Sequence, residues 1–206
     1  MNISKQSNPV YDAIAEQYAR EFTEPSDYID EFLTYLPEYA RILDAGCGAG
    51  VDAGYMAEKG YTVTGIDQSK EMVRLAQKKF PHIEFRYQDM KEIDFPPDSF
   101  DGIVAACSLI HIPKNDVPGV IETFSRILKP GGMLYLAVQG GEQKELFIPE
   151  PLKPDEKLFL NIMSYVEIKN FLEKYEFMIV TKYEREPDRE KELDFTKLFV
   201  LARKGN

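Results

Sequence analysis

The sequence predicts an α/β protein with a doubly wound, mostly parallel sheet. Three observations lead to this prediction. Between residues 41 and 138, short apolar runs alternate with helical patterns of ten to fifteen residues. A glycine-rich turn at residues 46–50 directly follows the first apolar run. Residues 177–183 and 195–203 are two strand-like segments joined too closely for a crossover helix, which favours an antiparallel pair at the sheet edge.

The composition indicates a globular protein of one domain. The 206 residues are 44% hydrophobic and 29% charged, and a chain of this length can bury a sizeable core. The net charge of −10 argues against a nucleic-acid backbone as the main partner, because phosphate binding needs a basic face. Cys47 and Cys107 match neither a metal-ligand spacing nor a disulfide framework. With no apolar leader or membrane-length run, we expect a cytoplasmic protein without a membrane partner.

Residues 1–40 are expected to form a helical cap on this domain. Asn8 and Pro9 resemble an N-cap followed by proline at the first helical position. The helix after them presents an apolar stripe, made of Val10, Ile14, Tyr18 and Phe22. A second helix is predicted over 26–36, ended by Pro37.

Residues 41–138 are expected to form the ligand-binding core of the sheet. Strands are predicted at 42–45, 61–67, 83–87, 100–106 and 133–138. Helices are predicted over 51–59, 69–79 and 116–128. Gly60 suits the position just after the first helix, and Ser69 suits the N-cap of the second. A polar loop is expected at 88–98.

The last third of the chain differs in pattern. Residues 139–163 contain two glycines, three prolines and many charges, which predicts a long connection without regular structure. Its apolar residues, with Phe147 and Phe159 among them, favour a substrate lid, although simple cover for the sheet edge is an equal alternative. Residues 164–206 then supply a helix, opened by a capping box at Ser164, and the antiparallel strand pair.

The glycine turn and two acids point to a ligand. Asp44 ends the first apolar run, and glycines follow at positions 46, 48 and 50. Glycines after a buried strand let the backbone turn sharply and approach a ligand closely. Asp67 ends the next strand, where a carboxylate can accept hydrogen bonds from a ribose diol. The pattern predicts a nucleoside-containing cofactor that lies across two adjacent strand ends.

Two kinds of cofactor can be weighed against this turn. Read from Gly48, the sequence nominally matches the G-x-G-x-x-A motif of dinucleotide-binding enzymes. That motif should begin directly at the strand end, and Asp52 would place a negative charge where the pyrophosphate binds. Read from Gly46, with Asp44 before it, the turn fits a cofactor that lacks phosphates and carries a positive amino group.

Several separated stretches together resemble the class I S-adenosylmethionine-dependent methyltransferases, particularly the small-molecule type. The resemblance covers nearly the whole chain and rests on stretches in the family's order, at residues 44–50, 65–69, 88–90, 100–104 and 128–134. The resemblance implies a seven-stranded sheet with an antiparallel last strand, and S-adenosylmethionine as the cofactor. The acidic composition favours a small or cationic acceptor, and a protein acceptor remains an alternative.

The resemblance also implies how the methionine portion of the cofactor would be held. Gly46 and Gly48 would bring backbone groups against it, and Asp44 would face its ammonium group directly or through water. An aromatic residue of the N-terminal helix, Tyr11 or Tyr18, would close over the carboxylate. Tyr18 could equally pack on the apolar stripe without contacting a ligand.

The nucleoside portion would meet a second set of residues. Asp67 would hold both ribose hydroxyls, with Gln68 beside the adenine. Asp89 would accept from the adenine amine, and the backbone N–H of Met90 would meet a ring nitrogen. Each acid also has a structural alternative, since Asp67 could cap the following helix and Asp89 could be a solvated loop residue.

The end of the fourth strand is where an acceptor is expected. By the resemblance, Cys107 or Ser108 would lie under the methionine. His111 follows them, and its imidazole titrates near neutrality, so it is the candidate general base; a purely structural role is the alternative. His82 precedes the third strand and would lie at the opposite end of the sheet.

The leading hypothesis is therefore an S-adenosylmethionine-dependent methyltransferase that acts on a small molecule. A non-catalytic module that binds S-adenosylmethionine is the first alternative, and a dinucleotide-dependent oxidoreductase is a more distant one. No metal ligands are expected. The pattern identifies neither the acceptor atom (O, N, S or C) nor the oligomeric state.

Overall fold

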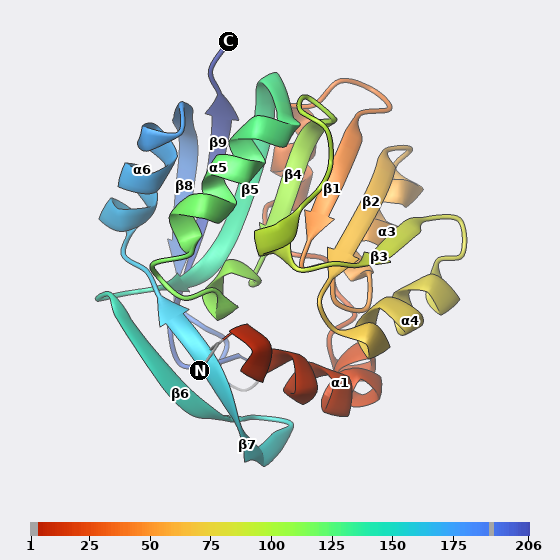
Figure 1. Cartoon of the computed structure of the whole chain (residues 1–206), viewed down its shortest axis with the longest axis vertical. Coiled ribbons are helices and arrows are strands. Elements are labelled where there is room, and N and C mark those ends of the chain that lie inside the picture. The colour runs from red at the N-terminus through yellow and green to blue at the C-terminus, as the bar shows by residue number, and fades with distance from the viewer. Residues whose placement is uncertain (1–3, 190–191) are drawn as a thin grey trace.

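A seven-stranded sheet organises the molecule. The computed structural model describes residues 4–189 and 192–206, with side chains from residue 9 onward. Its strand order is β3-β2-β1-β4-β5-β9-β8, and β9 runs in the opposite direction to the other strands (Figure 1). The five core strands are β1 (Arg41–Ala45), β2 (Thr62–Asp67), β3 (Glu84–Tyr87), β4 (Phe100–Ala106) and β5 (Leu128–Gly140). The predicted α/β class and sheet are confirmed.

Helices cover both faces of the sheet (Figure 1). One face packs against α5 (Val117–Ile127) and α6 (Tyr165–Lys174). The other packs against α2 (Ile29–Thr34), α3 (Val51–Glu58) and α4 (Lys70–Lys79). The two hydrophobic clusters place the sheet between them, as right-handed crossovers require.

Local signals place the helix ends where the sequence predicts them. The Ser69 hydroxyl accepts a hydrogen bond from the Met72 backbone N–H and caps α4. Ser164 and Glu167 form a reciprocal capping box at the start of α6. Gly60 follows α3 with a φ of +93°, a left-handed conformation that glycine adopts without steric cost.

The C-terminal strands complete the sheet. β8 (Phe177–Arg185) and β9 (Thr196–Lys204) pair antiparallel, as predicted. The last strand inserts between β5 and β8, so β8 forms the edge. β9 is buried along most of its length because it lies between two neighbours.

The N-terminal prediction is partly wrong. Helix α1 spans Ser4–Glu21, so Pro9 lies inside it rather than at its first position. Proline is tolerated there because it lies near the helix start and removes only one intrahelical hydrogen bond. The second helix is shorter than the predicted 26–36, because Tyr28 takes a left-handed conformation (φ 61°) and the helix begins after it.

The predicted structureless connection at 139–163 is also wrong. Most of it forms an antiparallel hairpin of β6 (Lys144–Glu150) and β7 (Lys153–Ile162). Two of its prolines, Pro151 and Pro154, lie at or beside the turn between these strands, where their missing N–H groups cost little. Figure 1 shows this hairpin and α1 across the ends toward which the parallel strands point.

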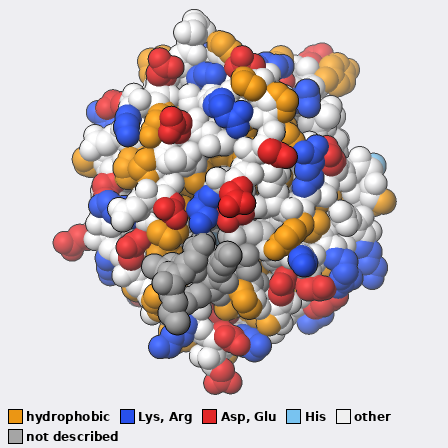
Figure 2. Space-filling model, in the orientation of Figure 1, with side chains coloured by type: hydrophobic (Ala, Val, Ile, Leu, Met, Phe, Trp, Pro, Cys, Tyr) orange, Lys and Arg blue, Asp and Glu red, His pale blue; other side chains and the backbone are white. Residues whose placement is uncertain are grey.

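The surface carries charges of both signs. On the face drawn in Figure 2, Lys and Arg side chains lie among Asp and Glu side chains rather than in one broad patch. In the part of the chain that the structure describes, no helix has the length and apolarity needed to cross a bilayer. The same residues contain no group of three or more side chains arranged to hold a metal ion.

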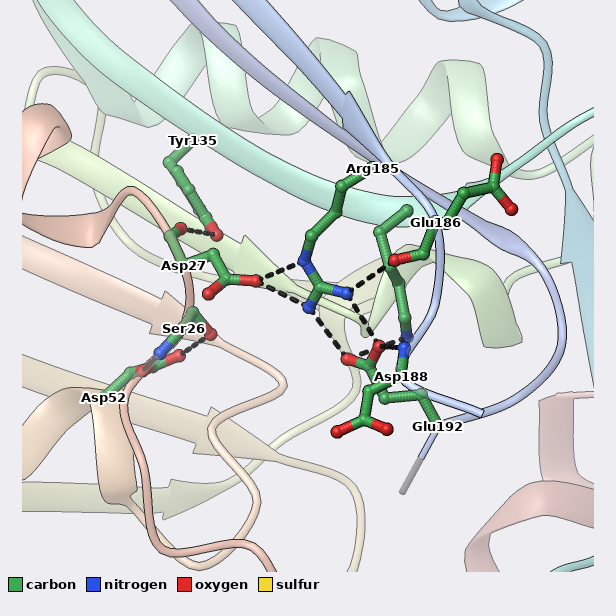
Figure 3. Close-up of polar contacts among 9 residues, drawn as sticks. Ser26, Asp27, Asp52, Tyr135, Arg185, Glu186, Asp188 and Glu192 are labelled. Atoms are coloured by element: carbon green, nitrogen blue, oxygen red, sulfur yellow. Dashed lines mark hydrogen bonds and ion pairs between the residues drawn. The ribbon is translucent and has the colours of Figure 1, made fainter. Parts of the chain in front are cut away.

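An arginine clasp joins the C-terminal region to the segment between α1 and α2 (Figure 3). The Arg185 guanidinium donates to the Asp27 carboxylate at 2.6 and 2.8 Å and to both carboxylate oxygens of Glu192 at 2.8 and 2.9 Å. The Tyr135 hydroxyl donates to the backbone carbonyl of Asp27. The adjacent Ser26 donates through its N–H and hydroxyl to Asp52, in the first turn of α3. The clasp thus fixes the segment that leads out of α1.

Replacing Arg185 with Met should destabilise the protein in a pH-dependent way. The guanidinium holds the pKa of Glu192 down at about 2, against an ordinary value of 4.5. Because a lowered folded pKa stabilises the protein above the ordinary pKa, this contribution is complete above about pH 5 and is lost as the pH falls toward 2. We expect a loss of up to about 1 kcal/mol at pH 7, since solvent screens the pair.

Urea unfolding of the wild type and of Arg185→Met at several pH values measures this effect. Lys182→Met on the same strand is the control, because it removes an ion pair between two largely exposed side chains. A difference between wild type and Arg185→Met that stays constant from pH 7 to pH 3 would contradict the prediction.

Candidate functional site

One cleft opens at the carboxyl ends of the parallel strands. Its empty space, measured out to open solvent, is about 650 Å³. Helix α1 lies along one side, and the glycine turn and strand tips form the other. The lining residues are Tyr11, Tyr18, Gly46, Gly48, Ile66, Asp67, Gln68, Ser69, Met72, Gln88, Met90, Ala106, Cys107, Ser108 and His111.

The glycine turn lies tightly against the neighbouring strand tips. The backbone N–H groups of Gly46 and Cys47 donate to the Ile66 carbonyl at 2.8 and 3.0 Å. Gly46 has a φ of +84°, and a Cβ atom there would lie 2.3 Å from the Cβ of Ser108. A side chain is therefore excluded at Gly46 by both conformation and space.

Asp67 is fixed at the tip of β2 by two backbone donors. Its carboxylate accepts from the N–H of Gly48 at 2.9 Å and from that of Ser69 at 2.8 Å. Burial raises the pKa of Asp67, while these two N–H groups act in the opposite direction. The carboxylate is thus oriented toward the cleft, and Ser69, not Asp67, caps α4.

Asp44 lies behind the glycine turn instead of lining the cleft. It is only 2% exposed, and its Oδ2 atom has no hydrogen-bond partner among the described residues. Burial raises the pKa of Asp44 well above its ordinary value, and the nearby carboxylates of Asp52 and Asp67 add to the shift. A cation placed beside the turn would favour the ionised form of this carboxyl.

Asp89 also lies outside the lining. Its carboxylate accepts from the Lys91 N–H at 2.9 Å and caps the short 3₁₀ helix Met90–Glu92. Its neighbours Gln88 and Met90 do line the cleft. The other predicted cofactor residues (Tyr18, Gly46, Gly48, Asp67, Gln68, Met90 and Cys107) are brought together around the same cleft.

Cys107 follows β4 in a left-handed conformation, with a φ of +49°. Its N–H donates to the Ala137 carbonyl at 2.8 Å, which holds the strained residue at the cleft wall. Cys107 is exposed at the cleft wall, and desolvation by the surrounding protein raises the pKa of its thiol, so the thiol stays protonated at neutral pH. Cys107 is therefore suited to packing against a ligand and not to acting as a nucleophile.

His111 is buried where α1, the loop after β4 and the hairpin meet. It ends the 3₁₀ helix Leu109–His111 and is 7% exposed. Its Nε2 lies 2.8 Å from the Tyr11 hydroxyl, and its Nδ1 lies 3.0 Å from the Phe159 carbonyl of β7. Burial lowers the pKa of His111 to about 4, so the imidazole is neutral at physiological pH.

Asp12 connects α1, beside the cleft, to the start of α4. The Asp12 carboxylate accepts from the Ser69 hydroxyl at 2.6 Å and from the Glu71 N–H at 3.1 Å, both at the start of α4. Glu16 forms an exposed ion pair with Arg74. Asp12 therefore connects the helix that covers the cleft to the helix that follows Asp67.

Sequence reasoning gave less weight to some lining residues than their positions warrant. Tyr11 lies seven residues before Tyr18, so the two share a face of α1 over two helical turns. Met72 lies on the buried face of α4, one turn after its N-cap. For Tyr11, the spacing from Tyr18 on the same helix is the signal that could have placed it toward the cleft; for Met72, it is the position on the buried face of α4.

Comparison with known proteins identifies this arrangement. The family model described as "Methyltransferase domain" matches residues 42–132. Residues 42–132 are therefore similar to a methyltransferase domain. A crystal structure of an S-adenosylmethionine-dependent methyltransferase from Methanosarcina mazei aligns with a TM-score of 0.79 and 25% identity, over 87% of this chain and 99% of that one. The domain's cofactor is S-adenosylmethionine.

Curated relatives match the same part of the chain. YqeM of Bacillus subtilis, named as a candidate methyltransferase, is 44% identical over 108 residues, which are 50% of this chain and 44% of YqeM. A ubiquinone biosynthesis O-methyltransferase of Paracidovorax citrulli is 36% identical over 103 residues, or 47% of this chain and 42% of that protein. The match thus spans less than half the length of either relative.

The contact between Gly46 and Ser108 can be tested by comparing two glycines. Gly46→Ala should lower the free energy of unfolding by about 1–3 kcal/mol more than Gly60→Ala, because a buried overpacked side chain adds to the cost of positive φ. Gly60 has a similar φ of +93°, but nothing lies within 4 Å of its Cβ position. Urea unfolding of both variants is the measurement, and equal losses would show that the turn does not press on Ser108.

Proposed function

We propose that this protein is a methyltransferase that transfers a methyl group from S-adenosylmethionine to a small-molecule acceptor. The observation that carries the proposal is the Asp67 carboxylate, which the N–H groups of Gly48 and Ser69 fix at the tip of β2 beside the glycine turn. A ribose diol donates two hydrogen bonds, and a fixed carboxylate at a strand tip accepts them. The methyltransferase domain match at residues 42–132 supports the same function.

The lining residues suit the parts of this cofactor. Asp67 would hold the ribose, with Gln68 beside the adenine and the Met90 N–H near its ring. Asp89 would accept a hydrogen bond from the adenine amine only if its carboxylate lost the hydrogen bond from the Lys91 N–H. The proposed contact of Asp89 with adenine therefore requires a change of hydrogen-bond partner.

The methionine portion would lie along the glycine turn. Gly46 and Gly48 leave room there, and Cys107 and Tyr18 form the facing walls. The cofactor carries an ammonium group, and the unpartnered Oδ2 of Asp44 is the buried anion that would complement it, directly or through water. Carboxyl groups are therefore placed to meet both the ribose and the ammonium group of the cofactor.

The acceptor would enter at the His111 end of the cleft. Methyl transfer from a sulfonium needs alignment and exclusion of water more than strong acid–base chemistry, and proximity alone can contribute roughly 7–11 kcal/mol. The hairpin β6–β7 packs against the loop at this end, since its Phe159 carbonyl accepts from His111 and its Asn161 side chain donates to the Ile112 carbonyl. We propose that the hairpin is the substrate lid and that His111 takes up the acceptor's proton.

A small acceptor is supported by one relative. The relative from Paracidovorax citrulli is named for ubiquinone biosynthesis, which points to small-molecule chemistry in that protein. A non-catalytic binding module would bind the same cofactor without releasing S-adenosylhomocysteine in the presence of any acceptor.

Asp67→Ala should weaken binding of S-adenosylmethionine by at least about tenfold, because two charge-assisted hydrogen bonds are lost. Isothermal titration calorimetry with S-adenosylmethionine, S-adenosylhomocysteine and NAD measures the affinity and the choice of cofactor. Asp101→Ala is the matched control: this carboxylate also accepts a backbone N–H, from Arg41, and pairs with Lys129, but it lies at the opposite end of β4.

The control should lose some stability and keep its affinity for the cofactor. Unchanged affinity in Asp67→Ala would show that the ribose assignment is wrong. Binding of NAD without binding of either sulfur compound would contradict the proposed function itself.

A further inference from the structure

We propose that Tyr11 is the residue that meets the acceptor, that His111 acts through it, and that the acceptor atom is therefore a nitrogen or oxygen that carries a hydrogen. This inference rests on the proposed function and narrows its substrate class. It starts from a chain of two hydrogen bonds that joins α1, the loop after β4 and the hairpin. The chain runs from the Tyr11 hydroxyl through the His111 ring to the Phe159 carbonyl.

The direction of both hydrogen bonds follows from their partners. A backbone carbonyl can only accept, so His111 Nδ1 carries the proton and donates to Phe159. In a neutral ring the other nitrogen, Nε2, is then an acceptor. The Tyr11 hydroxyl, 2.8 Å away, must donate to it. The hairpin thus sets the tautomer of His111, and His111 sets the orientation of the Tyr11 hydroxyl.

The burial of the pair keeps this arrangement in place. His111 is neutral near pH 7 because burial lowers its pKa to about 4. Burial also raises the pKa of the Tyr11 hydroxyl well above its ordinary value, so Tyr11 does not ionise by itself. The titratable groups whose charge acts on Tyr11 are Tyr18 on the same helix, Glu150 of β6, Asp67 of β2 and Cys107 after β4.

The Tyr11 hydroxyl donates its proton to His111. Only the lone pairs of its oxygen are then available to a group bound in the cleft. Both Tyr11 and His111 line the cleft beside Cys107, at the end opposite the adenine site proposed above. A group bound there must donate a hydrogen bond to Tyr11. An amine or hydroxyl does so while its own lone pair points elsewhere, toward the methyl group. A thioether or a tertiary amine has no hydrogen to donate.

Tyr11 and His111 can also accept the proton that the methyl acceptor loses. The acceptor atom bonds to the methyl carbon while the carbon–sulfur bond breaks and its electron pair stays on sulfur. The acceptor's proton passes to the Tyr11 oxygen as the Tyr11 proton passes to His111 Nε2. The positive charge lost from sulfur is then carried by the His111 imidazolium, which returns its proton to solvent after product release. His111 is thus a positioning residue and proton store, and Tyr11 is the catalytic contact.

The hydrogen-bond chain can be measured without an acceptor. The protein has two histidines, so ¹⁵N-histidine NMR of the complex with S-adenosylhomocysteine gives two ring systems, and His82→Asn assigns them. We expect His111 as the Nδ1–H tautomer, titrating near pH 4, with an Nε2 signal that shifts in Tyr11→Phe. An Nε2–H tautomer, or a Tyr11→Phe spectrum identical to that of the wild type, would overturn the chain.

Turnover tests the acceptor class. The probes are simple phenols, catechols and primary amines, each paired with its O-methyl or N,N-dialkyl analogue, together with a dialkyl thioether; release of S-adenosylhomocysteine is the readout. Only probes with an N–H or O–H should react. Tyr11→Phe should lower kcat/KM by about 10²–10⁴-fold, as expected for loss of general acid–base assistance, with the Kd for S-adenosylmethionine unchanged.

Further variants distinguish loss of the Tyr11 orientation from a general loosening of α1. His111→Gln keeps an acceptor for the Tyr11 proton and should retain more activity than His111→Leu. Glu16→Gln removes an exposed ion pair of α1 with Arg74 outside the cleft, and it should keep wild-type kcat/KM. Full activity of Tyr11→Phe, or turnover of a probe without a transferable proton, would overturn this inference and leave the proposed function standing. Failure of the wild type to bind S-adenosylmethionine or to turn over any probe would contradict the proposed function as well.

Discussion

The close approach of the glycine turn to the tips of β2 and β4 is the constraint on which the site depends. The N–H groups of Gly46 and Cys47 bond to the Ile66 carbonyl, and the N–H of Gly48 bonds to Asp67. A side chain at Gly46 would collide with Ser108. These contacts fix the Asp67 carboxylate and the end of β4 relative to each other. The two places where a donor and an acceptor would bind are therefore set by backbone atoms, which move less than side chains.

The segments that lie over the glycine turn and the strand tips are far apart in the chain. Helix α1 contributes Tyr11 and is held to α4 through Asp12, and the hairpin contributes the Phe159 carbonyl. Both segments meet at His111. A single buried imidazole therefore links the N-terminal cap, the loop after β4 and the hairpin, and it orients the Tyr11 hydroxyl.

Much of the fold can be predicted from the sequence because its signals are local. Apolar runs followed by Ser69 or Ser164 caps define strands and helix starts, and the spacing of Asp44, Gly46 and Asp67 brings two strand tips together. The hairpin at 139–163 escaped prediction because its prolines resemble a loop, while its strands are stabilised by pairing with each other and by contact with α1. Periodicity within one segment does not show such pairing.

The contacts of individual site residues were less predictable for the same reason. Tyr11 and His111 are separated by 100 residues, and only the folded chain brings them within 2.8 Å. Asp89 resembled a ligand-binding acid, yet its carboxylate is committed to the Lys91 N–H next to it. Asp44 lies behind the turn rather than in the cleft. Local sequence predicts which strand end a residue occupies, but tertiary packing decides which way its polar atoms point.

A crystal structure of the protein with S-adenosylhomocysteine tests the central claim most directly. The account predicts both ribose hydroxyls within hydrogen-bond distance of the Asp67 carboxylate, the amino acid portion along Gly46 and Gly48, and the sulfur directed toward Tyr11 and His111. A complex in which the ribose lies away from Asp67, or in which the sulfur faces away from the Tyr11 hydroxyl, would contradict it.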